Sequence, residues 1–261
     1  MLVGNDVSDY QEGIDYATFK NNANFVIAKA TEGTTYIDTW FGNNRQQARN
    51  VGLPRMFYHF ARPDKGNDPI AEAKFFLAVL NGQPLQEGEC LALDFEENTD
   101  NPVDWAKKWL DYVFQETGVK PYFYSYQSML TSYDWSPVVN AGYPLWIAAP
   151  NGDPNNTSYQ TGAWKSAMCH QWGTETVPGI SGSVDGDSFF GDVAAFLASG
   201  YHVLVPAPND PPTIPPTQPS TPPQPVPSTP NPAPAPSPQP VPKVSLCSIL
   251  IGWLQKHCPL Q

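Results

Sequence analysis

Three acidic side chains fall within four residues, directly behind an apolar run. The stretch LALDFEEN (residues 91–98) has the pattern of a buried strand that ends in Asp94, Glu96 and Glu97. Burying a charged group is costly unless the charge is paired. Side chains alternate along a strand, so we expect Asp94 and Glu96 to face one side and Glu97 the other.

Two adjacent carboxyl groups can divide the work of acid catalysis between them. Repulsion between like charges raises the pKa of one group, which keeps its proton near neutral pH while its neighbour stays ionised. Glycoside hydrolysis needs an acid that protonates the leaving oxygen and a carboxylate that stabilises the cationic transition state. We therefore predict that Asp94 and Glu96 are catalytic. Taken alone, the motif could also be a strand end that only caps the next helix.

Strand-like and helix-like segments alternate through the first 203 residues. The strand-like runs are 2–6, 24–30, 55–61, 89–96, 120–126, 144–149, 166–172 and 183–189, and helix-like patterns follow the first four at 14–22, 39–52, 68–82 and 101–118. Such alternation indicates βαβ units and a mainly parallel sheet. Eight strands in about 200 residues predict an α/β fold, an irregular (β/α) barrel whose helices lie mainly in its first half. A doubly wound open sheet is the alternative, but no Gly-rich phosphate loop opens its first helix.

Active sites of such barrels form at the carboxyl ends of the strands. The polar and charged residues predicted there are Asp6, Lys29, Glu32, His59, Asp94, Glu96, Gln171, Asp185 and Asp187. The aromatic residues predicted there are Tyr58, Tyr124 and Trp146, which could stack on sugar rings. Carboxylates from the first, fourth and eighth strands that meet at one barrel mouth are better explained by catalysis than by capping.

The composition changes abruptly after the predicted barrel (residues 1–203). No charged residue occurs from Pro211 to Pro242, and this segment is rich in proline. Such a composition predicts a disordered, extended linker over residues 204–243. Residues 244–261 have the polar and apolar faces of a short amphipathic helix, which could contact a membrane surface, the cell wall or another copy of the chain. A fortuitous pattern in a frayed tail is the alternative.

Charge and cysteine content exclude several classes of function. The 25 acidic and 14 basic residues give a net charge of -11, which argues against a nucleic-acid partner. The four cysteines are too few for a disulfide framework: Cys90 and Cys169 are expected as buried thiols, and Cys247 and Cys258 could pair only in an oxidising compartment. No CxxC motif or His/Cys cluster predicts a metal site, and no cofactor is expected.

The first ten residues, MLVGNDVSDY, lack a basic segment followed by an apolar one. We therefore expect synthesis in a cytoplasm without a signal peptide, and action on an outside target only after release.

Seven segments, in order, resemble the motifs of one known family. They are GNDVSDYQEGIDYATFK, FVIAKATEGTTYID, GLPRMFYHFARP, LALDFEEN, PLWIAA, CHQWG and SVDGDSF. This order is similar to that of glycoside hydrolase family 25, the cell-wall muramidases of the Ch type, which include phage endolysins. The resemblance spans about residues 3–200 and is specific, because several ordered motifs carry it.

The resemblance implies a barrel that cleaves the β-1,4 bond between N-acetylmuramic acid and N-acetylglucosamine in bacterial peptidoglycan with retention. It implies that Glu96 is the general acid/base and that Asp94 assists, either as nucleophile or by steadying the substrate's own N-acetyl group. Asp6 and Asp185 match the two flanking acids. The groove is expected to be lined by Tyr58, Tyr124, Trp146 and Gln171. We expect a monomeric catalytic domain from a phage or prophage endolysin.

Two other functions remain open, and the sequence differs from the family at one position where an aromatic residue often contacts a sugar. A chitinase-like hydrolase also uses a D-x-E strand end, although Ala92 and Cys90 stand where it would carry further acids. A non-catalytic wall-binding protein on the same scaffold is the second alternative, which the presence of all four acids disfavours. Ala149 and Pro150 follow the WIA segment, where the family often has an aromatic residue.

Overall fold

The structure is a computed structural model, and it describes residues 1–203. Its elements are β1 (Leu2–Val7), α1 (Tyr16–Phe19), β2 (Phe25–Glu32), β3 (Tyr36–Ile37), α2 (Phe41–Asn50), β4 (Arg55–Phe60), η1 (Pro63–Lys65), α3 (Pro69–Asn81), β5 (Cys90–Asp94), α4 (Pro102–Thr117), β6 (Tyr122–Tyr126), α5 (Gln127–Ser132), α6 (Ser136–Asn140), β7 (Leu145–Ala148), β8 (Cys169–Glu175), β9 (Val184–Phe189) and α7 (Val193–Ala198). The predicted linker (204–243) and C-terminal segment (244–261) lie outside the described residues. Within residues 1–203, no helix is both long and apolar enough to cross a membrane.

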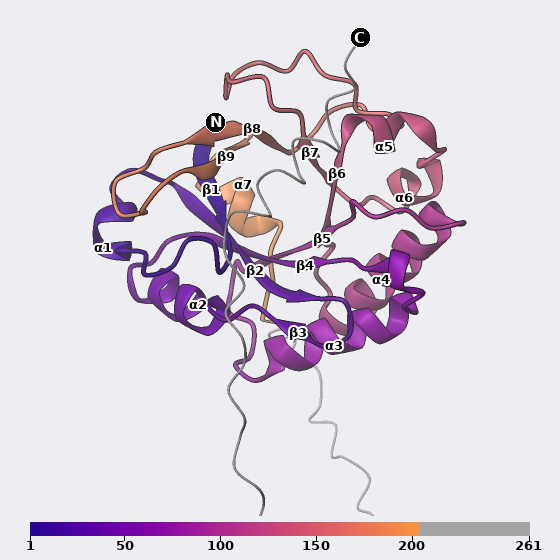
Figure 1. Cartoon of the computed structure of the whole chain (residues 1–261), viewed down its shortest axis with the longest axis horizontal. Coiled ribbons are helices and arrows are strands. Elements are labelled where there is room, and N and C mark those ends of the chain that lie inside the picture. Colours follow the sequence, from indigo (N-terminus) through magenta and orange to yellow (C-terminus); the bar gives the residue numbers. More distant parts are fainter. Residues whose placement is uncertain (204–261) are drawn as a thin grey trace, which may run out of the picture. The chain divides into compact units, whose positions relative to one another are not determined.

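Eight strands close into a barrel (Figure 1). Their order is β1, β2, β4, β5, β6, β7, β8 and β9, and β9 returns to β1. Neighbouring strands are parallel except at β9, which runs antiparallel to both β8 and β1. The predicted irregular (β/α) barrel of mainly parallel strands is confirmed. The sequence analysis missed β3, a two-residue strand paired antiparallel to β2.

Helices α2, α3 and α4 cover the outside of the first half of the barrel (Figure 1). Helix α3 begins at Pro69, and the preceding Asp68 accepts a hydrogen bond from the backbone N–H of Ala71 at 2.9 Å. Helix α4 begins at Pro102 and ends at Thr117, and the next residue, Gly118, has a φ of 72°, which suits glycine. These local signals explain why the early helices were predictable. Residues 149–168, between β7 and β8, contain no helix, which makes the second half irregular.

Strand alternation divides the core into two parts. The side chains that fill the barrel are Leu2, Phe25, Ile27, Met56, Tyr58, Cys90, Ala92, Tyr122, Tyr124, Trp146, Cys169, Phe189 and Phe196. Those between barrel and helices include Phe57, Leu91, Leu93, Phe95 and Trp109. Helix α7 contributes Phe196 to the interior, with its ring centroid 5.2 Å from those of both Phe25 and Phe189. The interior of the barrel is therefore a packed core and not a channel.

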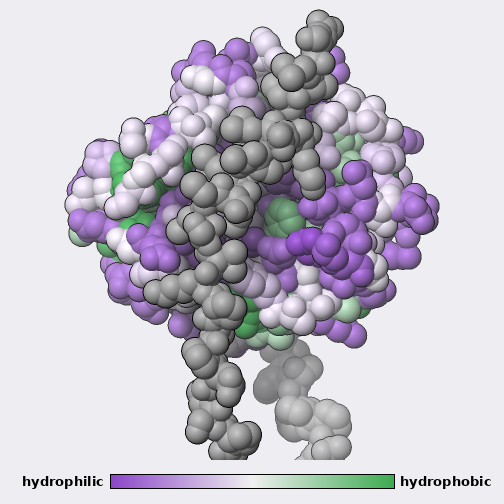
Figure 2. Space-filling model, in the orientation of Figure 1, coloured by the Kyte–Doolittle hydropathy of each residue, from purple (hydrophilic) through white to green (hydrophobic). Residues whose placement is uncertain are grey.

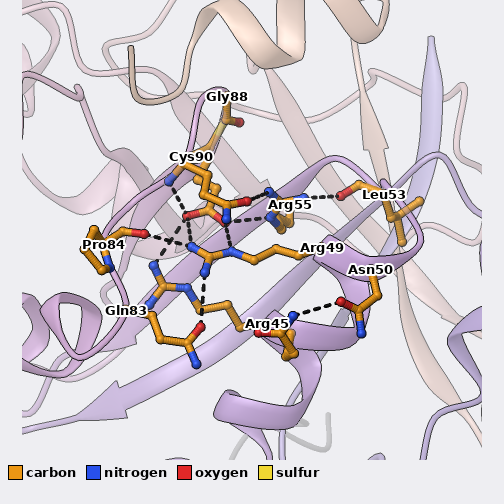
Figure 3. A network of polar contacts seen from close by, with 12 residues as sticks. Arg45, Arg49, Asn50, Leu53, Arg55, Gln83, Pro84, Gly88 and Cys90 are labelled. Carbon is orange, nitrogen blue, oxygen red and sulfur yellow. Dashed lines mark hydrogen bonds and ion pairs between the residues drawn. The ribbon is translucent and has the colours of Figure 1, made fainter. Parts of the chain in front are cut away.

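A buried ion cluster lies where β4 and β5 begin, at the opposite end of the barrel from the carboxyl ends of the strands (Figure 3). Glu89, which is 1% exposed, accepts hydrogen bonds at 2.7 Å from Nε of Arg49 and Nε of Arg55. Arg45 Nη2 lies 3.4 Å from the same carboxylate and Nη1 donates to the carbonyl of Leu80. The cluster therefore links helix α2 to the amino ends of strands β4 and β5.

The surface that Figure 2 displays is largely hydrophilic outside the grey residues. Hydrophobic residues appear on this face as separate areas and not as one continuous patch (Figure 2).

Candidate active site

The four predicted catalytic acids converge on one end of the barrel. Asp94 is the last residue of β5 and faces the interior at 6% exposure, and Glu96 follows two residues later and is partly exposed. Phe95, between them, packs outside the barrel, as strand alternation predicts. Asp6 near the end of β1 lies directly opposite Asp185 of β9.

The direction of β9 corrects one step of the sequence argument. Asp185 was placed at the site as a residue near the carboxyl end of a parallel strand. In the structure β9 is antiparallel, and Asp185 is its second residue. The amino end of β9 therefore meets the carboxyl ends of the other strands, and this reversal brings Asp185 to the mouth.

Burial and mutual repulsion dominate the electrostatics of the Asp94–Glu96 pair. Burial, followed by the charge of Glu96, raises the pKa of Asp94 well above its ordinary value, and Lys29 opposes this effect. A hydrogen bond between the two carboxyl groups contributes in the same direction as the burial. Burial and repulsion therefore favour a state in which the two carboxyl groups share one proton, as catalysis by a carboxyl pair requires.

A second hydrogen-bonded chain fixes Asp6. Gln171 Nε2 donates to Asp6 Oδ2 at 2.8 Å, and Gln171 Oε1 accepts from the Tyr124 hydroxyl at 2.9 Å. Burial raises the pKa of Asp6, whereas the hydrogen bonds from Gln171 and Asp187 lower it. The pKa values of the Tyr58 and Tyr124 hydroxyls are raised by burial and also by charges that include Asp6, Asp94 and Glu96. The charges of the acids therefore affect the pKa values of both tyrosines.

Asp185 provides a test of this environment. Burial, and then the charge of Asp6, raises the pKa of Asp185 to about 7. The folded state therefore binds this proton more tightly than the unfolded state, and the free energy of unfolding should fall as pH rises from the ordinary aspartate value to about 7. We expect Asp185→Asn to remove the part of this decline that Asp185 contributes, which urea unfolding of both proteins across that pH range would measure. Parallel stability curves for the two proteins would contradict the assignment.

Lys29 and Glu32 lie at the edge of this site. Lys29 Nζ donates to Glu32 at 2.8 Å, and Glu32 also pairs with Arg62 at 2.6 Å. Burial tends to raise the pKa of Glu32, but the hydrogen bonds from Lys29 and Arg62 outweigh it and lower that pKa. Glu32 is therefore an ionised partner that holds Lys29 near Asp94. Direct contact of either residue with substrate stays a prediction.

The prediction that His59 contributes to the site is wrong. Its ring is fully buried outside the barrel, where Nδ1 lies 2.8 Å from Thr31 Oγ1 and Nε2 lies 2.8 Å from Glu72 Oε2. The ring also stacks on Trp109 with a centroid distance of 5.4 Å. Strand alternation explains the error: Tyr58 faces the barrel interior, so its neighbour His59 must face the helices.

Trp146 and Asp187 lie beneath the site and do not line it. Trp146 is 1% exposed and Asp187 is fully buried, so the prediction that they contact substrate is wrong. Trp146 Nε1 donates to Asp187 Oδ1 at 2.8 Å. The Trp146 ring lies 4.3 Å from that of Tyr124, between centroids, and therefore supports a residue that the site does use.

Two further residues lie beside the site, and sequence reasoning did not assign a role to either of them. The hydroxyl of Tyr126 donates to the backbone carbonyl of Glu96 at 3.3 Å and so braces the segment that carries this acid. Arg62, just after β4, holds Glu32 as described above. Tyr126 ends a predicted strand, so the strand-end criterion places it at the barrel mouth, whereas nothing in the local sequence marks Arg62. Within residues 1–203, no group of three or more His, Cys, Asp or Glu side chains is arranged to hold a metal ion.

Comparison with known families shows to which family the chain belongs. The model of glycosyl hydrolases family 25 matches residues 5–180, which include Asp6, Asp94 and Glu96. The chain belongs to this family. It is a glycoside hydrolase, and the resemblance read from the motifs is confirmed.

Known lysozymes and muramidases are similar to most of the described part of the chain. The autolytic lysozyme of Clostridium acetobutylicum is 31% identical over 198 residues, which are 72% of this chain and 56% of that protein, so the chain spans little more than half of that relative. The N,O-diacetylmuramidase of Chalaropsis sp is 31% identical over 206 residues, 70% of this chain and 95% of that protein. A solved bacterial lysozyme from Streptomyces coelicolor superposes with a TM-score of 0.66 at 26% identity, covering 76% of this chain and 96% of that one.

Proposed function

We propose that the chain is an N-acetylmuramidase that cleaves the β-1,4 bond between N-acetylmuramic acid and N-acetylglucosamine in peptidoglycan, with retention of configuration. The observation that carries the proposal is the Asp94–Glu96 pair at the barrel mouth of a family 25 hydrolase, joined electrostatically to Asp6. In this role Glu96 is the general acid and then the general base. Asp94 either attacks the sugar or steadies its N-acetyl group.

Product analysis tests this proposal against its alternatives. Digestion of purified peptidoglycan should yield new reducing ends that are muramic acid, initially with the β-configuration. Release of reducing N-acetylglucosamine, or activity on chitin oligomers without activity on peptidoglycan, would favour the chitinase-like alternative. Sedimentation with cell walls without any new reducing ends would favour the non-catalytic one.

A pocket beside the site suits a polymeric substrate. It has a volume of about 390 Å³ and is lined by Asp100, Asn101, Pro102, Val103, Asp104, Lys107, Tyr133 and Pro137. Asp100 follows Glu96 by four residues, so a fully extended chain would separate them by at most about 14 Å. An aromatic ring among polar groups is an arrangement that can contact a sugar ring or a peptide stem.

We expect Tyr133→Ala to raise KM for peptidoglycan roughly three- to tenfold with little change in kcat, because Tyr133 is 39% exposed in this pocket and not at the catalytic acids. Hydrolysis kinetics on peptidoglycan, and on glycan strands stripped of their peptides, would check this. An effect confined to intact peptidoglycan indicates that the pocket contacts the peptide, and an effect on both substrates indicates a sugar contact. An unchanged KM on both would contradict the role of the pocket.

We also propose that the enzyme acts in host lysis as a phage or prophage endolysin, made in the cytoplasm and active on the wall after release. The support is the organisation of the sequence, a catalytic domain followed by a Pro-rich stretch and a short terminal segment. Bacteria that express the chain should stay intact until their membrane is permeabilised, and then lyse. Lysis without permeabilisation would contradict this. A truncation at Pro206, compared with the full chain, measures what residues 207–261 add to wall binding.

A further inference from the structure

Asp187 is a buried acid with an unusual set of partners. It lies on β9 opposite Gly4 of β1 and Gln171 of β8, so it is one inward-facing position deeper than Asp185. Its Oδ1 accepts the indole N–H of Trp146 at 2.8 Å. No N–H group or hydroxyl within residues 1–203 donates to its buried Oδ2. A buried carboxylate oxygen without a donor is costly, and this one needs an explanation.

The carboxyl group of Asp6 resolves this problem. The side chains of Asp187 and Asp6 are within hydrogen-bonding reach of each other. Two carboxylate oxygens form a hydrogen bond only if one of them carries a proton. Asp187 is the fully buried member, whereas Asp6 is partly exposed and already accepts from Gln171. Burial favours the neutral form, so the proton belongs on Asp187.

From this geometry we propose that Asp187 is a positioning residue, a neutral carboxylic acid that donates a hydrogen bond to Asp6, favours the ionised form of Asp6 and orients it at the barrel mouth. All hydrogen bonds in the network then have one direction. Tyr124 donates to Gln171, and Gln171 donates to Asp6. From the other side Trp146 donates to Asp187, which donates to Asp6. In this arrangement the negative charge of the network rests on Asp6, which is partly exposed at the barrel mouth.

The direction of the pKa shift of Asp187 agrees with this assignment. Burial, the charge of Asp6 and the hydrogen bond to Asp6 all raise the pKa of Asp187 well above its ordinary value. The same hydrogen bond lowers the pKa of Asp6, and so offsets part of the larger upward shift that burial causes in that group. Four side chains from four strands, none of which has to touch the sugar, therefore set the charge of a single carboxylate.

Two variants at position 187 separate this role from a charged one. Asparagine can donate to Asp6 through its amide and still accept from Trp146, so Asp187→Asn should retain kcat within about threefold. Asp187→Ala removes the acceptor of the Trp146 indole N–H and one of the two hydrogen bonds to Asp6, and should lower kcat at least about tenfold. KM should be nearly unchanged, because Asp187 does not touch substrate. The mirror change, Asp6→Asn, should abolish activity, since it removes the charge itself.

A substrate-free measurement keeps the test independent of the proposed hydrolysis, on which the kinetic readout rests. The pH dependence of the free energy of unfolding counts the protons bound by the folded state. Near neutral pH, both Asp187→Asn and Asp187→Ala should bind one proton fewer than the wild type. An Asp187→Asn variant as inactive as Asp187→Ala, or an unchanged proton count in both, would overturn the proposal.

Discussion

Glu96→Gln is expected to lower the rate of peptidoglycan hydrolysis by a factor on the order of 10³ or more, without unfolding the protein. Glutamine has the shape of glutamate but cannot transfer a proton to the leaving oxygen, and general acid catalysis by one side chain contributes about 10²–10⁴ to a rate. Glu96 is partly exposed at the mouth, so the change leaves no cavity. Release of reducing ends from purified peptidoglycan measures the loss, and thermal unfolding verifies the fold.

The chain contains a matched control next to this residue. Glu97 is also partly exposed and follows Glu96 directly, so alternation should turn it away from the acid pair. Glu97→Gln should therefore retain activity within about twofold. Equal losses in both variants would mean that the segment after β5 is sensitive as a whole, and full activity of Glu96→Gln would remove Glu96 from the catalytic role.

Glu89→Gln is expected to produce the largest loss of stability of any isosteric change in the domain. The substitution leaves Arg45, Arg49 and Arg55 without their shared counter-charge, and Glu89 and Arg45 are 1% and 2% exposed. Removing one partner of a buried ion cluster costs about 3–5 kcal/mol of the free energy of unfolding. For a domain of this size, each kcal/mol of lost stability lowers the midpoint of thermal unfolding by about 2–4 °C. Urea and thermal unfolding would measure both quantities.

The pH dependence of this loss identifies its cause. Burial tends to raise the pKa of Glu89, but hydrogen bonds from Arg49 and Arg55 outweigh it and hold that pKa below the ordinary value. The ionised form therefore stabilises the fold above the ordinary pKa of glutamate, and this contribution is lost as pH falls through the lowered pKa. The difference in the free energy of unfolding between the wild type and Glu89→Gln should therefore become smaller at acidic pH. A constant gap would indicate a packing effect.

A surface variant and the site itself provide the controls. Glu116→Gln, at an exposed position of α4, should change the free energy of unfolding by no more than about 0.5 kcal/mol. Since the Glu89 cluster lies at the other end of the barrel from Asp94, the folded Glu89→Gln protein should hydrolyse peptidoglycan at the wild-type rate well below its unfolding midpoint.

Local pattern by itself determined the strands, the early helices and the acid pair. Apolar runs gave all eight barrel strands, and Pro–Gly boundaries gave α3 and α4, because these signals act within a few residues of chain. The spacing of Asp94 and Glu96 was sufficient to place both on one side of a strand end, since a period of two is a property of the strand alone.

Tertiary structure decided the roles of the other polar residues, because pairing partners and strand direction are set by residues far apart in the sequence. His59 and Tyr58 are adjacent in sequence, yet one contacts Glu72 outside the barrel and the other lies inside it. The antiparallel course of β9 brings Asp185 to the mouth and leaves Asp187 buried against Trp146. Only closure of the barrel, which joins β9 to β1, places a carboxyl from one end of the domain beside Asp6 and so sets the charge of the site.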